Sequence, residues 1–276
     1  MAFPETRIGF IGAGNMARAI IGGLLQAGHR PASIAAADPS GEARDRARAL
    51  HPGLRLSDDN LAVAKGCEAL VLAVKPQSLP AVAAALGPRP AGQLLLSIAA
   101  GARLASLRRW LGAEAALVRA MPNQPALAGA GMSVLVAGGG LAPEQRALAE
   151  YILQAAGETG WVDDESLLDA VTAISGSGPA YFYLLTEILE DSAREMGIPA
   201  ELAARLARQT AYGAGLVARD SGLGLAELRE SVTSPGGTTA AALASLEQAG
   251  YRAIVAAALR AARQRAVELG DAADDH

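Results

Sequence analysis

The sequence predicts an α/β fold in two parts, an amino-terminal domain with a mainly parallel sheet followed by an all-helical carboxy-terminal domain. Short apolar β-like runs alternate with helical patterns as far as Trp161, and this alternation is typical of parallel βαβ units. A glycine-rich turn joins the first run to the first helix. From Glu165 onward the pattern is helical almost without interruption. We therefore expect a boundary near residue 163, between domains of residues 1–163 and 164–276.

The composition limits the classes of protein to consider. A chain of 276 residues and 28.0 kDa can form two domains, each with its own core. Its apolar stretches are all broken before about 18 residues, the length that spans a bilayer, so we expect a soluble protein. The first ten residues, MAFPETRIGF, show no secretory signal, and the single cysteine, Cys67, fits a reducing cytoplasm. A net charge of -4 without a basic block argues against nucleic acid, and three scattered histidines give no metal-ligand spacing.

In the first domain, strands and helices are expected to alternate along the chain. The β-like runs are residues 7–11, 33–37, 69–74, 94–98, 116–120 and 132–137. Helical spacing follows the glycine-rich turn as far as Gly28 and occurs again at residues 41–50, 78–86 and 103–112. Strands joined through helices favour a parallel sheet.

The second half reads as alanine-rich helices with few aromatic residues. Breaks are expected at SGSGPA, at residues 197–199, near residues 222–224 and at SPGG. Small side chains let helices pack very closely, within one chain or between two. We expect an interleaved dimer, with a monomeric bundle as the alternative. Met196, Tyr183 and the leucines near them repeat at helical spacing and are expected in the core.

The turn after the first strand has the sequence Gly12-Ala-Gly14-Asn15-Met16-Ala, a G-x-G-x-x-A pattern directly before a helix. Glycines there allow a tight turn and a close approach of the backbone to a pyrophosphate, which then lies at the positive end of the helix. A Rossmann-type dinucleotide site is therefore predicted, and a merely tight βα turn is the alternative.

An acidic residue, Asp38, ends the second strand, 24 residues after the second glycine of the turn. This is close to the offset of about 20 residues for an acid that bonds the ribose 2′-hydroxyl, which favours NAD over NADP. Alternatively, Asp38 caps the helix that starts near Gly41. The neighbouring Arg44, Arg46 and Arg48 could still neutralise a 2′-phosphate, so both cofactors stay open.

Two later strands end in proline-containing loops. Residues Val74-Lys75-Pro76 end one strand, and the proline exposes the lysine at the carboxyl edge of the sheet, where ligands of open α/β sheets bind. Asn123 lies between two prolines after another strand. Its amide could orient a nicotinamide, or it could satisfy local backbone groups, while Lys75 could be a solvated loop lysine.

The helical half contains two unusual stretches. Residues 175–181, SGSGPAY, interrupt a helix with residues that permit close backbone approach, which favours contact with a ligand or partner over a bare kink. Residues 234–239, SPGGTT, make a poor helix interior but a good helix entrance. Unpaired N–H groups at such an entrance, with flanking hydroxyls, can hold a carboxylate without a cation.

Five motifs, in this order and across nearly the whole chain, give a resemblance to the pyrroline-5-carboxylate reductase family. They are GAGNMA, AVKPQ, MPNQPA, AISGSGPAY and VTSPGGTT. The resemblance implies a Rossmann-type domain, a helical dimerisation domain and hydride transfer from NADPH or NADH to the C=N bond of 1-pyrroline-5-carboxylate, giving L-proline in the last step of proline biosynthesis. It also implies a substrate site built from the SPGGTT loop at a dimer interface, often with dimers gathered into rings.

The motifs and the resemblance together name the site residues. Thr239 is the expected catalytic residue, whose hydroxyl contacts the ring nitrogen. The expected substrate-binding residues are Ser177, Ser234, Gly236, Gly237, Thr238 and Thr239. The expected cofactor-binding residues are Gly12, Gly14, Asn15, Met16, Asp38, Asn60, Val74, Lys75, Pro76 and Asn123. The chain departs from the family pattern at Gln124, where threonine is common, and at Asp38, where many NADPH-preferring relatives have small or basic residues.

Two other functions compete with this one. A related two-domain reductase acting on a hydroxy acid or another imine would commonly carry a lysine in its helical domain, but the two lysines, Lys65 and Lys75, both lie in the first. A non-catalytic dinucleotide-sensing protein would not need the intact SPGGTT stretch. A protonated cyclic imine is already electrophilic, so position and polarity matter more than a strong acid, and no obligatory general acid is assigned.

Overall fold

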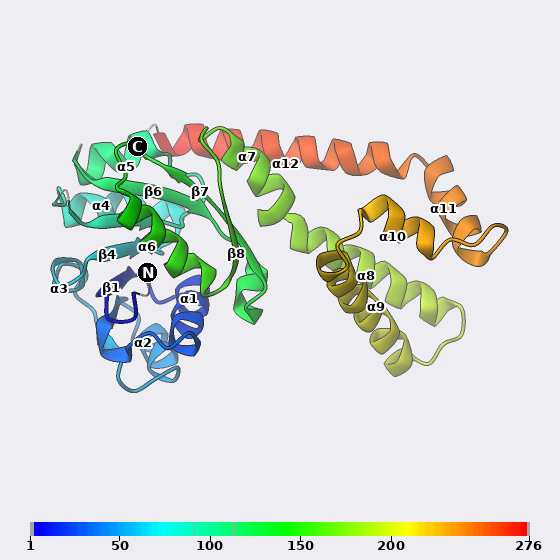
Figure 1. Cartoon of the computed structure of the whole chain (residues 1–276), viewed down its shortest axis with the longest axis horizontal. Helices are drawn as coiled ribbons and strands as arrows, with labels where there is room; N and C mark the ends of the chain where they lie inside the picture. The colour runs from blue at the N-terminus through cyan, green and yellow to red at the C-terminus, as the bar shows by residue number, and fades with distance from the viewer. Residues whose placement is uncertain (1–2, 91, 113, 275–276) are drawn as a thin grey trace. The chain divides into compact units, whose positions relative to one another are not determined.

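A computed structural model of the chain describes residues 3–90, 92–112 and 114–274 (Figure 1). By contacts between Cα atoms the chain divides into two compact units. The first comprises residues up to Gly176 together with those from Ala262 onward, and the second comprises Ser177–Ala261. The functional boundary near residue 163 remains a prediction from the sequence.

The first unit is built on one eight-stranded sheet, with the order β3-β2-β1-β4-β5-β6-β7-β8. The strands are β1 Ile8–Ile11, β2 Ile34–Ala37, β3 Arg55–Ser57, β4 Ala69–Leu72, β5 Leu94–Ser97, β6 Ala116–Met121, β7 Gly131–Ala137 and β8 Gly157–Trp161. All neighbouring pairs are parallel except β6 and β7, which are antiparallel. The predicted α/β fold with a mainly parallel sheet is confirmed.

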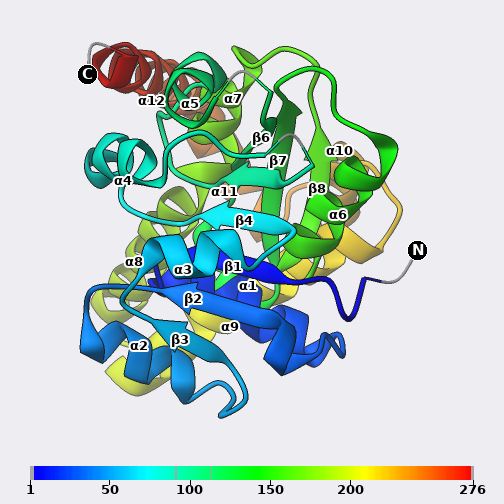
Figure 2. The same cartoon turned by 90° about the vertical axis from the view of Figure 1, so that its left-hand side faces the viewer.

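Helices cover both faces of this sheet, as the end-on view in Figure 2 shows. They are α1 Asn15–Gln26, α2 Gly41–Arg48, α3 Asn60–Lys65, α4 Leu79–Leu86, α5 Leu104–Leu111, α6 Pro143–Gln154 and α7 Leu167–Val171. Residues alternate between the faces along each strand. On β1, Ile8 and Phe10 join a core cluster that includes side chains of α1, α2 and α6. Ile11 points to the other face and joins the cluster of α3, α4 and α5.

Two strands of the sheet, β3 and β8, were not expected from the sequence. β3 has three residues, Arg-Leu-Ser, and lies at the edge of the sheet. β8 reads Gly-Glu-Thr-Gly-Trp, and its two glycines weaken the β-like pattern. Both strands owe their place to pairing with a neighbour, β2 for β3 and β7 for β8, which a local pattern does not reveal.

The second unit contains helices and no strand among its described residues. The helices are α8 Gly178–Glu195, α9 Ala200–Asp220, α10 Leu225–Ser231, α11 Thr238–Gln248 and the first part of α12 Tyr251–Asp274. Their ends confirm the breaks predicted from glycine, proline and serine. Among the described residues, no helix combines the length and apolar character needed to cross a membrane.

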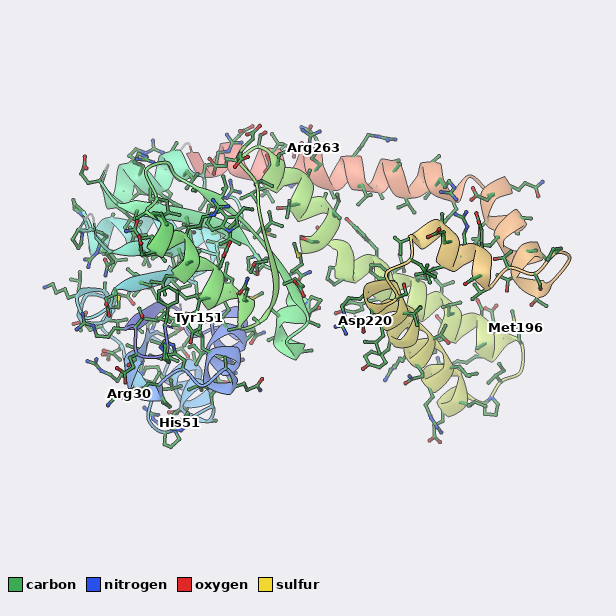
Figure 3. All side chains as sticks on the ribbon, in the orientation of Figure 1. Arg30, His51, Tyr151, Met196, Asp220 and Arg263 are labelled. Atoms are coloured by element: carbon green, nitrogen blue, oxygen red, sulfur yellow. The ribbon has the colours of Figure 1, made fainter. Side chains whose placement is uncertain are left out.

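The predicted core position of Met196 and Tyr183 is wrong for the single chain. Met196, labelled in Figure 3, is 80% exposed, and Tyr183 is 56% exposed. Within Ser177–Ala261, the buried hydrophobic residues are Ala203 and Ala207. The helical spacing does mark an apolar surface, but this unit alone does not supply enough of its own chain to cover it.

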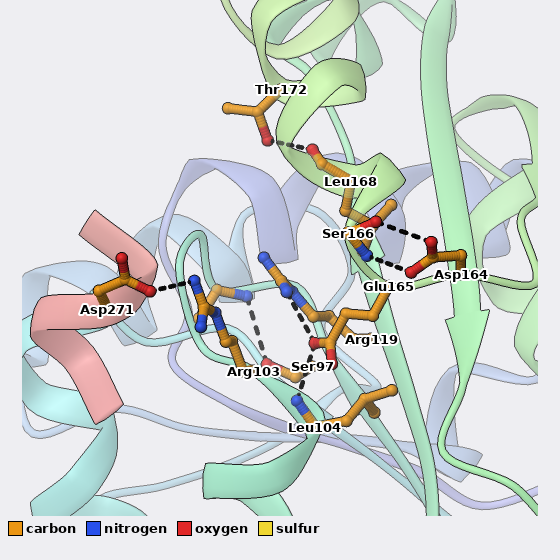
Figure 4. A network of polar contacts seen from close by, with 11 residues as sticks. Ser97, Arg103, Leu104, Arg119, Asp164, Glu165, Ser166, Leu168, Thr172 and Asp271 are labelled. Carbon is orange, nitrogen blue, oxygen red and sulfur yellow. Dashed lines mark hydrogen bonds and ion pairs between the residues drawn. The ribbon is translucent and has the colours of Figure 1, made fainter. Parts of the chain in front are cut away.

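An ion pair between a buried arginine and a partly exposed glutamate holds the segment before α7 against the sheet (Figure 4). Arg119 of β6, whose side chain is 6% exposed, donates to Oε1 of Glu165 at 2.7 Å. The same oxygen accepts the N–H of Leu104, the first residue of α5, at 2.8 Å. One residue earlier, Arg103 pairs with Asp271 of α12 at 2.5 Å. The start of α5 therefore anchors both the chain that leads into the second unit and the helix that returns from it.

A second buried polar group, His29, lies between α1 and β2 in the sequence. Its Nε2 lies 3.0 Å from the carbonyl oxygen of Thr6, which can only accept, so Nε2 carries the proton. Its Nδ1 lies 3.0 Å from the hydroxyl of Tyr151, labelled in Figure 3, and accepts from it. Burial lowers the pKa of His29, and the bond to Thr6 opposes this shift.

Replacing Glu165 by alanine should destabilise the fold far more than replacing Asp271. The first change leaves the buried Arg119 guanidinium without its carboxylate, a loss of roughly 3 kcal/mol, the lower end of the range for a buried pair, because Glu165 itself is partly exposed. The second removes the partner of a more exposed pair, at a cost of about 0–1 kcal/mol. Chemical denaturation of both variants at one protein concentration measures the difference. Equal losses of unfolding free energy in the two variants would show that the Arg119–Glu165 pair contributes no more to stability than the more exposed Arg103–Asp271 pair.

Stability should fall as the pH drops below about 6.5, the pKa of an unfolded histidine. Because the pKa of His29 is lowered in the folded chain, the unfolded state binds the proton first, so the contribution of His29 is complete above that pH and is lost below it. His29→Gln keeps polar contacts without titrating and should flatten the profile between pH 5 and 6.5. Thermal unfolding across this range measures both proteins, and superimposable profiles would contradict the assignment.

Candidate active site

The carboxyl ends of three neighbouring strands meet beside the glycine-rich turn. β1 lies between β2 and β4, the point where the strand order changes direction and where open α/β sheets bind ligands. The N–H of Gly12 donates to the carbonyl oxygen of Ala37 at 2.7 Å, and the N–H of Ala73 donates to that of Ile11 at 2.8 Å. These bonds hold the residues that follow the three strands side by side.

The two glycines of the turn have different surroundings. Gly12 has a φ of 98°, and a Cβ there would lie 2.7 Å from the carbonyl oxygen of Ala73. The fold itself therefore requires this glycine. Gly14 is exposed at the N-terminus of α1, and a Cβ there would have no neighbour within 4 Å. The protein leaves that space open beside free helical N–H groups, which fits the pyrophosphate of a dinucleotide.

Asp38 braces the same turn through its carboxylate. Oδ2 accepts the N–H of Ala13, and Oδ1 accepts the N–H of Ser40, each at 2.9 Å. The alternative that Asp38 caps α2 is wrong, because the hydroxyl of Ser40 occupies that position and accepts the N–H of Ala43 at 3.3 Å. This contact between Asp38 and Ala13 was not predicted from the sequence. It could have been, because residues that follow two adjacent parallel strands are neighbours, and Asp38 follows β2 while Ala13 follows β1.

The other predicted cofactor residues of the first unit lie around this edge. Asn15 begins α1, and its Oδ1 accepts from Nη2 of Arg18 at 2.6 Å. Met16 packs against the core cluster of that sheet face. Asn60 is the first residue of α3, after a cap formed by Asp59. The residues that follow β4 are Val74, which is half-buried, and the exposed Lys75 and Pro76.

The amide of Asn123 satisfies local backbone groups, which was the alternative to orienting a nicotinamide. Its Oδ1 accepts the N–H of Met132 at 2.8 Å, and its Nδ2 donates to the carbonyl oxygen of Ser175 at 3.0 Å. The side chain thus ties the loop after β6 to the start of β7 and to a π-helical turn, Thr172–Gly176. A contact between Asn123 and the cofactor stays a prediction.

The SGSGPA break consists of that π-helical turn followed by the start of α8. A Cβ at Gly176 would lie 2.7 Å from Cε of Met121, so the first glycine permits close packing. Ser177 precedes α8 and is half-buried. π-Helical turns are frequent at functional sites, and a ligand contact of Ser177 remains a prediction.

The SPGGTT stretch forms a tight turn that opens directly into α11. The N–H of Gly237 donates to the carbonyl oxygen of Ser234 at 3.0 Å, and Gly236 has a φ of 69°. Proline at the second position and a left-handed glycine at the third are typical of a type II turn. α11 begins at Thr238 without a side-chain cap among the described residues, so its first N–H groups have no partner within the helix. This is the predicted anion-binding entrance.

The structure thus places the predicted residues in two groups. All the cofactor residues lie in the first unit, most of them around the ends of β1, β2 and β4, with Asn123 after β6. Ser177 and the residues of the SPGGTT loop lie in the second unit. Each group has the backbone geometry of an anion site, one at the start of α1 and one at the start of α11.

Comparisons with known proteins identify the family of both parts of the chain. Residues 165–269 match the family model for pyrroline-5-carboxylate reductase dimerisation, and residues 7–101 match that for coenzyme F420-dependent NADP oxidoreductases. The chain is 46% identical to pyrroline-5-carboxylate reductase of Pseudomonas aeruginosa, over 96% of this chain and 97% of that one.

Two solved structures of pyrroline-5-carboxylate reductases are also similar to this chain. The enzyme of Coxiella burnetii is 37% identical, with a TM-score of 0.91 over 96% of this chain and 98% of the other. That of Plasmodium falciparum, solved with NADP bound, is 29% identical, with a TM-score of 0.85 over 98% of this chain and 100% of the other.

Alanine substitutions at the two glycines of the turn should separate folding from cofactor binding. Gly12→Ala should lower the free energy of unfolding by about 2 kcal/mol or more. The new Cβ would collide with the carbonyl oxygen of Ala73, and alanine is strained at the positive φ of this position. Gly14→Ala should cost about 1 kcal/mol or less of stability. It should weaken NADP+ or NAD+ binding about tenfold, because its Cβ takes the space of the pyrophosphate. Calorimetric titration measures the affinity, and wild-type affinity in Gly14→Ala would contradict this placement.

Proposed function

Since the chain belongs to the pyrroline-5-carboxylate reductase family, we propose that it reduces 1-pyrroline-5-carboxylate to L-proline with NADPH or NADH. Its place is then the last step of proline biosynthesis. The observation that carries the proposal is the SPGGTT turn, which opens α11 with glycines, hydroxyls and uncapped N–H groups. The stretch contains no cation, which suits a small substrate whose carboxylate is held by peptide dipoles.

The cofactor is held by the first unit in this proposal. When bound, the dinucleotide supplies a hydride, and the protein supplies binding and orientation. The N-terminal turn of α1, with Gly12, Gly14, Asn15 and Met16, holds the pyrophosphate. Asp38 and Asn60 lie on the adenosine side. The loop residues Val74, Lys75 and Pro76, together with Asn123, line the path toward the nicotinamide.

The substrate is held by the second unit. The N–H groups at the start of α11 bind the carboxylate, and the hydroxyls of Ser234 and Thr238 flank it. A glycine at position 237 leaves room for the carboxylate. It also leaves room for the Ser234 hydroxyl, because a Cβ at Gly237 would lie 2.4 Å from Oγ of Ser234. Ser177, at the start of α8, is assigned to the same substrate site by the resemblance.

Thr239 orients the reacting bond. It is the second residue of α11 and is half-buried, whereas Thr238 is exposed. Its hydroxyl forms a hydrogen bond with the ring nitrogen, which holds the C=N bond in one orientation for hydride transfer. Overall, the nitrogen of the imine takes one proton and the neighbouring carbon takes the hydride. An imine that binds in its protonated form already carries that proton, so no residue has to act as an obligatory general acid.

The enzyme is a homo-oligomer, as the dimerisation match over residues 165–269 indicates. We propose a dimer whose interface includes the exposed apolar side chains of α8 and α9. Rings of dimers follow from the family resemblance. A cytoplasmic location is supported by the lone free thiol, Cys67.

The proposal is tested by following NAD(P)H oxidation with two substrates. We expect turnover of 1-pyrroline-5-carboxylate, and a kcat/KM for carboxylate-free 1-pyrroline lower by about 10- to 100-fold, the equivalent of one or two charge-assisted hydrogen bonds. L-Proline should compete with the substrate. Gly237→Val should raise KM while leaving cofactor affinity unchanged. Equal efficiency with 1-pyrroline would remove the carboxylate role of the loop, and no turnover of either would remove the proposed activity.

Thr239→Val keeps the shape of the side chain and deletes its hydroxyl. The kcat/KM should fall by an amount equivalent to about 1–3 kcal/mol, the cost of an unsatisfied buried polar partner. Thr233→Val is a matched control in the same loop, because the Thr233 hydroxyl donates to the carbonyl oxygen of Arg229 at 2.6 Å. Steady-state kinetics of both variants decide the point. If Thr239→Val matched the wild type, another group would contact the nitrogen.

A further inference from the structure

We propose that Arg44 binds the 2′-phosphate of NADPH and thereby decides whether this chain uses NADPH as well as NADH. The inference rests on the proposed function, since it concerns the adenosine end of the same cofactor site. That end of a Rossmann-type site is read by residues just after the second strand, where an acid bonds the ribose hydroxyls of NAD and an arginine accommodates the extra phosphate of NADP.

Arg44 is held at this place by the loop that follows β2. Its Nη1 donates to the carbonyl oxygens of Asp38 at 2.6 Å and of Pro39 at 3.1 Å. The other terminal nitrogen, Nη2, lies over the start of α2, 3.9 Å from the position of a Cβ at Gly41. The side chain is half-buried, so the guanidinium is fixed beside the residue that marks the ribose position.

The geometry leaves the useful edge of the guanidinium available. An arginine has five N–H groups, and the two on Nη1 serve the two carbonyls. Nε and Nη2 form the edge that binds a phosphate through two parallel hydrogen bonds. Carbonyl oxygens fix the orientation without neutralising the charge, so the full positive charge remains for an anion.

The other two arginines of α2 differ from Arg44 in one respect. Arg46 pairs with Glu42 at 2.6 Å, and Arg48 pairs with Asp45 at 2.5 Å. Within the described part of the chain, Arg44 forms no ion pair. Among the three arginines of α2, Arg44 is therefore the one without a carboxylate partner in the described part of the chain, and it contacts the loop after β2 instead.

Asp38 acts against Arg44 at the same position. Both of its oxygens accept backbone N–H groups, yet a carboxylate can accept about four hydrogen bonds, so it still has capacity for the hydroxyls of an NADH ribose. Its charge repels a 2′-phosphate, and Arg44 offsets this repulsion. The chain should therefore accept both cofactors, with the affinity for NADPH depending on Arg44 and that for NADH depending on Asp38.

The test is a calorimetric titration of the full-length protein with NADP+, NAD+, 2′,5′-ADP and 5′-ADP. Arg44→Met keeps the apolar stem and removes the charge. It should weaken NADP+ and 2′,5′-ADP at least tenfold while changing NAD+ and 5′-ADP less than twofold. Arg46→Met and Arg48→Met carry the same charge change on the same helix and should behave like the wild type. Arg44→Lys should restore part of the affinity for NADP+.

The outcomes separate this inference from the proposed function. If wild-type protein bound neither NADP+ nor NAD+, the cofactor site itself would be wrong. If NADP+ bound and Arg44→Met weakened it no more than Arg46→Met, or weakened both cofactors equally, the role of Arg44 would be overturned. Retained NAD+ binding by Arg44→Met shows that the variant is folded. Asp38→Ser should shift the ratio the other way, toward NADP+.

Discussion

The second unit exposes a large apolar surface of its own, and in the proposed function the active enzyme depends on how that surface is covered. Its helices carry the exposed side chains of Phe182, Ile188 and Leu225, among others, while the hydrophobic residues buried within Ser177–Ala261 are Ala203 and Ala207. Burying apolar surface stabilises by roughly 25 cal/mol per Å². In the proposed dimer, a second copy of the same helices supplies that burial. The SPGGTT turn lies between α10 and α11 of this unit, so the proposed substrate site would be built on a framework that assembly completes.

In the proposed function, cofactor and substrate are recognised in the same way, by peptide groups at the start of a helix. At α1 the N–H groups face a space that Gly14 leaves open, and at α11 they follow the left-handed turn of Gly236. Peptide dipoles bind an anion without the long, flexible side chain of a lysine or arginine. Formal charge enters at the ribose edge, where Asp38 and Arg44 oppose each other. In this proposal, dinucleotide binding is a property of the fold, and the choice between two dinucleotides is a property of two side chains.

Much of this could be predicted from local sequence, because glycine, proline and hydroxyl residues mark turns and helix ends wherever they occur. The strand, turn and helix around Gly12 and the entrance at residues 234–239 were recognised in this way. Contacts distant in sequence could not be: the bond from Asp38 to Ala13, the tie from Asn123 to Ser175, and the pairing that makes strands of residues 55–57 and 157–161. The exposure of Met196 could not be predicted either, because helical spacing identifies an apolar face but not the chain that covers it.

The most direct test of this account is the activity per chain measured as the protein is diluted, with the association state followed by sedimentation under the same conditions. If the apolar face of the second unit is covered by a second copy and the substrate loop depends on it, activity per chain should fall in parallel with the fraction of dimer. Saturating cofactor and substrate should shift both curves together to lower protein concentration. A folded monomer with full activity would contradict the account, because the substrate site would then be complete within one chain.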